Sequence, residues 1–107
     1  MGTIHHHAIV VTSYDGELTR KVHQVAVRIG GNVSPVSYAS TNGYTSFCVF
    51  PDGSKEYWSE SDEADGRRKE LIKYIDSLAY EDGSNTVEYA HISFGELADT
   101  IETNCDA

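Results

Sequence analysis

Three histidines stand together near the start of the chain, and another lies in a late β-type segment. His5, His6 and His7 run directly into the apolar residues that end at Ser13. Alternate residues of a strand project to the same side, so His5 and His7 share one face. If the segment that holds His91 forms the neighbouring strand, three imidazoles converge there. Such a group suits zinc binding or acid–base chemistry near neutral pH.

His5, His7 and His91 are therefore the candidate metal-binding or acid–base residues. Metal sites usually add a thiolate or carboxylate ligand, and the sequence holds no HExxH or CxxC motif. The alternative is that these are half-exposed strand histidines near one end of a sheet. We predict no cofactor and assign no catalytic residue.

A second candidate site joins aromatic residues to a run of carboxylates after a turn at residues 51–53. Its residues are Glu56, Tyr57, Trp58, Glu60, Asp62 and Glu63. Trp and Tyr are enriched among the residues that dominate binding at protein interfaces, and loops often carry binding sites. The alternative is that Trp58 only caps the core where a helix begins. We predict that this segment binds another protein.

The acidic residues are unevenly distributed. Residues 1–54 hold three acidic and three basic residues, so residues 55–107 carry the whole net charge of −9. This excess argues against direct contact with nucleic acid, because phosphate binding needs clustered Lys and Arg to displace counterions. It favours a basic surface of another protein as the partner. The alternative is that the acids serve solubility alone.

Length and composition indicate one folded domain. The chain has 107 residues, of which 39% are hydrophobic. No apolar run approaches the ~18 residues that cross a bilayer, so we expect no contact with a membrane. Cys48 lies in an apolar run and Cys105 in a polar tail, which favours a reducing cytoplasm over a disulfide framework.

Hydrophobic spacing and turn residues predict the order β-α-β-β-α-β. The first helix is the clearest, with Leu18, Val22 and Val25 on one face, Asp15 as N-cap and Gly30 as the stop. The predicted strands span residues 4–13, 33–39, 44–51 and 86–94, and the predicted helices span 16–29 and 61–79. This order predicts a ferredoxin-like α+β fold. Four antiparallel strands, in the order 4-1-3-2, would carry both helices on one face.

The pair Asn42-Gly43 favours a two-residue type I′ hairpin turn. That turn predicts that Tyr38 faces Phe47, on the side that meets the helices. The other side of the sheet would carry small and apolar residues such as Cys48 and Phe50.

Such a sheet side is normally covered by another part of the chain, by a second copy or by a partner. We predict one domain over residues 1–94 and an acidic C-terminal extension over 95–107. That extension could cover the open side of the sheet, and a homodimer through that side is the next alternative.

Two segments, IHHHAIVVTSYD and NGYTSFCVFPDGSKEYWSESDEADGRR, resemble small uncharacterised proteins encoded by bacteriophages and prophages. The resemblance implies a short acidic protein that binds and disables a host protein. It supplies no catalytic residues.

Together, these observations predict a cytoplasmic, non-enzymatic binding protein. It would engage the basic surface of a host protein through the acidic and aromatic residues between Glu56 and Glu63. The alternative is a small histidine- or metal-dependent enzyme that cleaves a phosphodiester or a nucleotide, with His5, His7 and His91 at its centre.

Overall fold

The computed structural model describes residues 4–39, 41–51, 53 and 59–105, with the backbone alone for residues 59–61. The elements, in chain order, are β1 (His5–Ser13), α1 (Gly16–Ile29), β2 (Asn32–Val33), β3 (Ser37–Tyr38), β4 (Thr45–Phe50), α2 (Ser59–Asp76), β5 (Glu88–Gly95) and β6 (Thr100–Thr103).

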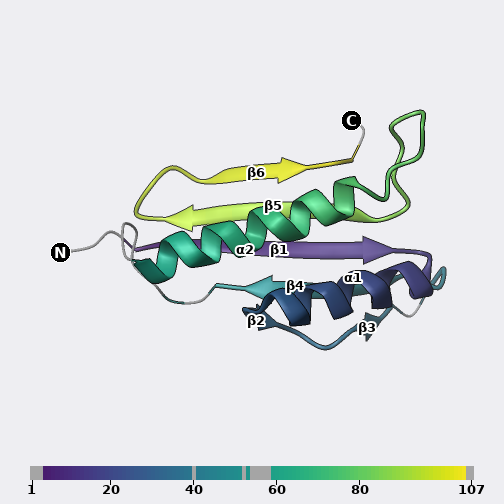
Figure 1. The fold of residues 1–107 in the computed structure, drawn as a ribbon, viewed down its shortest axis with the longest axis horizontal. Coiled ribbons are helices and arrows are strands. Elements are labelled where there is room, and N and C mark those ends of the chain that lie inside the picture. Colours follow the sequence, from purple (N-terminus) through teal and green to yellow (C-terminus); the bar gives the residue numbers. More distant parts are fainter. Residues whose placement is uncertain (1–3, 40, 52, 54–58, 106–107) are drawn as a thin grey trace.

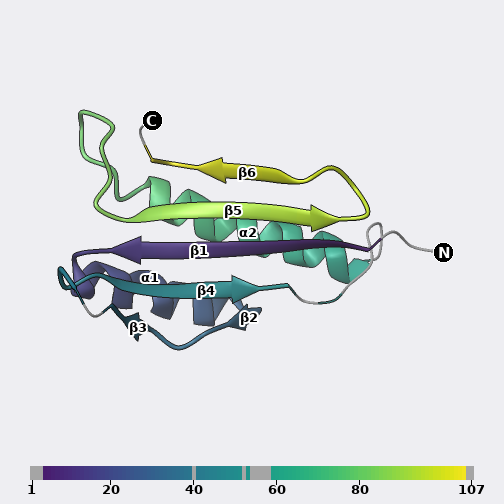
Figure 2. The ribbon, with the colours of Figure 1, turned by 180° about the vertical axis from the view of Figure 1, so that it is seen from behind.

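One antiparallel sheet carries both helices on the same face (Figure 1). Its strands follow the order β2-β4-β1-β5-β6, and the short β3 also pairs with β4. β1 is the central strand, hydrogen-bonded to β4 on one edge and to β5 on the other. Seen from behind, no described helix or loop covers the other face of the sheet (Figure 2).

The predicted α+β class, with two helices on one face of an antiparallel sheet, is confirmed. The predicted four-stranded ferredoxin-like sheet in the order 4-1-3-2 is wrong, because the sheet has six strands. Two differences account for this. The segment predicted as one strand over 33–39 forms two short strands, and residues after Gly95 add β6 at the edge of the sheet.

The start of α1 shows why its bounds could be predicted. The Asp15 carboxylate accepts hydrogen bonds from the backbone N–H groups of Glu17 (3.1 Å) and Leu18 (3.2 Å). These are donors that the helix itself cannot satisfy. At the other end, the N–H of Gly30 donates to the Ala26 carbonyl, and Gly30 has a φ of 101°, which favours glycine.

The core lies between the helices and the odd-numbered residues of β1. Ile9 and Val11 are fully buried, and the facing strand β4 adds Phe47. The helices contribute a second set of buried apolar residues, namely Val22, Ala26, Leu71 and Ile75. Removing groups of this size from water is the main favourable contribution to folding.

The hairpin register is not the predicted one. Tyr38 pairs with Thr45 instead of Phe47, and the Ala39 N–H donates to the Tyr44 carbonyl. The connection is therefore longer than two residues, although Asn42 and Gly43 both have the positive φ that a type I′ turn needs. Tyr38 is 69% exposed on a strand of two residues, so it does not reach the helices.

We call the uncovered side of the sheet the open face. Because side chains alternate along a strand, it comprises the residues between those of the core. On β1 and β4 these are His6, Ala8, Val10, Thr12, Ser46, Cys48 and Phe50, and on β5 and β6 they are Glu88, Ala90, Ile92, Phe94, Ile101 and Thr103.

The predicted side of the hairpin that carries Cys48 and Phe50 is part of this open face. Residues 100–103 extend the sheet at its edge by pairing with β5. They do not lie across the open face.

Replacing the α1 cap tests its contribution to stability. In Asp15→Ala, two N–H groups lose their acceptor, so we expect the free energy of unfolding in urea to fall by about 1 kcal/mol. Asp99→Ala, at an exposed residue between β5 and β6, is the control and should change it by less than about 0.5 kcal/mol. Equal losses in the two variants would contradict the capping role.

Candidate functional site

The structure brings His5, His7 and His91 together on the helix side of the sheet. The Nδ1 of His7 lies 3.3 Å from the Nε2 of His91, within hydrogen-bonding distance. The ring centroids of His5 and His7 are 5.3 Å apart, and those of His7 and His91 are 5.4 Å apart. The predicted convergence is therefore seen in the fold, as a chain of imidazoles with His7 in the middle.

His5 is the buried member of this row of three imidazoles. It is 8% exposed, and its Nδ1 has no hydrogen-bond partner among the described residues. The backbone of Gly95 packs against it, and a Cβ at Gly95 would lie 2.8 Å from the Ile4 carbonyl oxygen. Gly95 also has a φ of 136°, so only glycine fits here without strain.

His91, at the other end of this row of imidazoles, lines a cleft between α2 and the β5–β6 edge. The cleft has a volume of about 420 Å³, which is within the range of small-molecule sites. Besides His91, the cleft is lined by three basic and three acidic residues. They are Arg68, Lys69, Lys73, Asp65 and Asp76 of α2 and Glu102 of β6.

The surroundings of His91 favour its neutral form. Burial lowers the pKa of His91, and the nearby His7 and Arg68 lower it further, against the opposite effect of Glu102 and Asp65. The Oε2 of Glu102 lies 4.0 Å from the Nδ1 of His91. A neutral imidazole can accept a proton, so the His7–His91 pair is arranged to share or transfer one.

The part of the chain that is described contains no group of three or more His, Cys, Asp or Glu residues placed to hold a metal ion. The rings of His5, His7 and His91 contact one another in sequence and do not surround one point. The chemistry that this arrangement supports directly is hydrogen bonding and proton transfer.

The predicted acidic and aromatic site falls largely outside the described residues. Glu56, Tyr57 and Trp58 lie there, and Glu60 is described only as backbone of α2. Asp62 and Glu63 are exposed in the first turns of α2. The protein-binding role of this segment stays a prediction.

Arg68 is a residue of the cleft that sequence analysis missed. It is 8% exposed, and its guanidinium donates to the carboxylate of Asp65 three residues earlier. The spacing of Arg68 from the buried Leu71 and Ile75 places it on the buried face of α2, a signal that the sequence contained.

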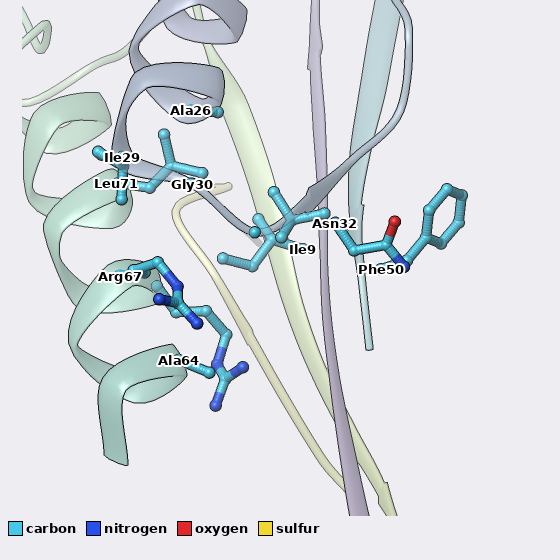
Figure 3. A pocket seen from close by; sticks show the side chains of 12 residues that line it. Ile9, Ala26, Ile29, Gly30, Asn32, Phe50, Ala64, Arg67 and Leu71 are labelled. Atoms are coloured by element: carbon cyan, nitrogen blue, oxygen red, sulfur yellow. The ribbon is translucent and has the colours of Figure 1, made fainter. Parts of the chain in front are cut away.

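A second cavity lies between the end of α1, α2 and the sheet (Figure 3). Its volume is about 30 Å³, far below the roughly 300 Å³ at which small-molecule sites begin, so it is too small for a substrate. Figure 3 also shows the ring of Phe50 on the far side of the strands from Arg67 and Leu71, in agreement with its place on the open face.

Comparison with known proteins gives no match to a family model, to a curated protein or to a solved structure. The resemblance to phage and prophage proteins therefore stays a prediction. No helix among the described residues is long and apolar enough to cross a membrane.

The His7–His91 contact can be tested by NMR titration. We expect the pKa of His91 to lie below about 6.5 in the native protein and to rise in His7→Gln, because a neighbouring positive charge is removed. His6→Gln, on the opposite side of β1, is the control. An unchanged pKa of His91 in His7→Gln would contradict the contact.

The same shift has a consequence for stability. The pKa of His91 is lower in the folded chain than in the unfolded chain, so the unfolded state binds the proton first as the pH falls. The contribution of His91 to stability is therefore lost as the pH decreases below about 6.5. In His7→Gln, the loss of stability between pH 7 and lower pH should be smaller than in the native protein.

Proposed function

We propose that this protein acts by binding another protein through the open face of its sheet. The observation that carries the proposal is a set of apolar side chains exposed together on that face. Phe94 is 43% exposed, Phe50 47%, Ile101 70% and Val10 36%. Large apolar patches on a folded protein commonly mark interaction sites.

The strand register joins Ile101 and Val10 to other apolar residues of the open face. Ala8 pairs with Ile92, which pairs with Ile101, so one apolar row crosses three strands. The next row runs from Cys48 through Val10 to Ala90. The apolar surface is therefore continuous across the middle of the sheet.

Polar residues lie at one end of the open face. Thr12 pairs with Ser46 on one side and with Glu88 on the other. The hydroxyl groups of Thr12 and Ser46 lie 2.6 Å apart and bond to each other. An apolar centre with a polar rim is the usual composition of a protein interface.

The binding-protein class agrees with the prediction from sequence, but the surface differs. The described part of the predicted surface, Asp62 and Glu63, is on α2 in the helix layer, whereas the open face is on the opposite side of the sheet. Apolar contact, and not charge, would dominate binding at the open face. Inhibition of a host protein is the role we expect from the phage resemblance.

A histidine-dependent phosphodiesterase is the second candidate. The distance of 3.3 Å between the His7 and His91 nitrogens, beside a cleft lined by Arg68, Lys69 and Lys73, favours it. The basic residues would hold a phosphate and the imidazoles would transfer protons.

An assay with bis(p-nitrophenyl) phosphate tests this second candidate. Hydrolysis should be at least 100-fold slower in His91→Gln than in the native protein. His6→Gln should behave as the native protein does. No hydrolysis above background by the native protein would count against the enzyme.

Affinity capture with matched variants tests the binding function. Ile101→Asp places a charge in the open face, whereas Val27→Asp places the same charge at a 56% exposed valine of α1. The native protein and Val27→Asp should capture the same partner, either untagged copies of the chain or a protein of a bacterial lysate, and Ile101→Asp should not. Capture should persist in 0.5 M salt, because apolar contacts are not screened.

Two results would contradict the proposal. One is equal capture by Ile101→Asp and the native protein. The other is a partner released by salt from all three proteins, which would instead favour the acidic surface of the chain.

A further inference from the structure

We infer that the partner of the open face is a second copy of this chain, in a face-to-face dimer. The inference rests on the proposed binding function and names the partner of the same site. Three properties of the face support a second copy: its charge, its size and the alternation of large and small side chains on it.

The first property is charge. The chain carries a net charge of −9, so two copies repel each other at a distance. Among the described positions of the open face, Glu88 bears the only carboxylate, at the polar end. Two copies can therefore meet there with little repulsion between the contacting groups. A basic partner would find little to attract it on this surface.

The second property is size. Strands lie about 4.8 Å apart and rise about 3.3 Å per residue, so β4, β1, β5 and β6, with 6, 9, 8 and 4 residues, form a face of roughly 430 Å² in projection. The accessible area exceeds this projected area because side chains stand out from the sheet. Each copy can thus contribute more than half of the ~800 Å² that a partner contributes to a standard interface.

The third property is shape. Phe94 and Ile101 are large and exposed, whereas Ala8, in the row of Ile101, and Ala90, in the next row, are small. In a two-fold arrangement the same patch meets itself, so the large residues of one copy can cover the small residues of the other. Two sheets packed in this way lie about 10 Å apart, as in a β-sandwich.

Sedimentation equilibrium of the full chain tests the dimer. In 0.5 M NaCl and at up to 0.5 mM protein, we expect a mass of twice the 11.8 kDa of one chain. In 0.05 M NaCl the dimer should dissociate more readily, because repulsion between the two negative copies is less screened. A complex with a basic partner would show the opposite dependence on salt.

Matched variants locate the contact. Ile101→Asp should weaken the dimer at least tenfold, because it buries a carboxylate, whereas Val27→Asp should change its dissociation constant about threefold at most. Phe94→Asp is a second face variant, and it should behave as Ile101→Asp does. Far-UV circular dichroism establishes that each variant is folded before it is compared.

The possible results separate the inference from the proposed function. A native protein that is monomeric in both salts overturns the second copy, and a dimer that withstands both face variants overturns the open face as its interface. If the native protein is monomeric but captures another protein through Ile101, the binding function holds and only the dimer fails. If it is monomeric and captures nothing, both fail.

Discussion

The structure depends on β1, a central strand that is apolar on both sides. Its backbone pairs with β5 from His5 to Thr12 and with β4 from Ile9 to Ser13. Ile9 and Val11 point to the helices and form the centre of the core, while Ala8 and Val10 point the other way. One layer of helices covers only one of these sides. The exposed apolar face is therefore a consequence of the strand that makes the core.

The same strand sets the position of the histidines. His5 and His7 continue the series of Ile9 and Val11 toward the beginning of β1, so they remain on the helix side of the sheet. The side of the sheet that is apolar in the middle of β1 becomes polar where the strand begins. There α2 supplies Arg68 and Asp65, and β5 supplies His91. The three histidines and the open face lie on opposite sides of the sheet.

The two sides suggest different roles for the protein. The cleft beside His91 is charged in both signs and open to water, which suits a small polar ligand. The open face is broad and nearly uncharged, which suits another protein surface. His91 and Glu102 of the cleft alternate with open-face residues of β5 and β6, so a ligand in the cleft and a partner on the face would contact residues adjacent in sequence.

The sequence predicts those elements of the fold that carry local signals. Asp15 and Gly30 mark the ends of α1 because capping geometry depends on a few neighbouring residues. The shared side of His5 and His7 follows from alternation along a strand, and the structure agrees. The start of α2, which lies at Ser59 and was expected at residue 61, follows in part from the acidic residues that come first in the helix.

Features that depend on distant contacts were not predicted. β6 has no alternating burial, because all four of its residues are exposed, so only pairing with β5 reveals it. The sequence wrongly predicts that Tyr38 faces Phe47, because the turn residues alone do not fix the length of the connection. The helical spacing of Arg68 from Leu71 and Ile75 indicates its burial, but the sequence does not show that the cleft beside it is formed with β5 and β6.

Contact between two open faces is the central claim, and isotope-filtered NOE measurements test it most directly. In a mixture of labelled and unlabelled chains in 0.5 M salt, the claim predicts intermolecular NOEs from the Phe94 ring and the Ile101 methyl groups to the methyl groups of Ala8 and Ala90. No intermolecular NOE, or NOEs confined to helix residues such as Val27, would contradict it.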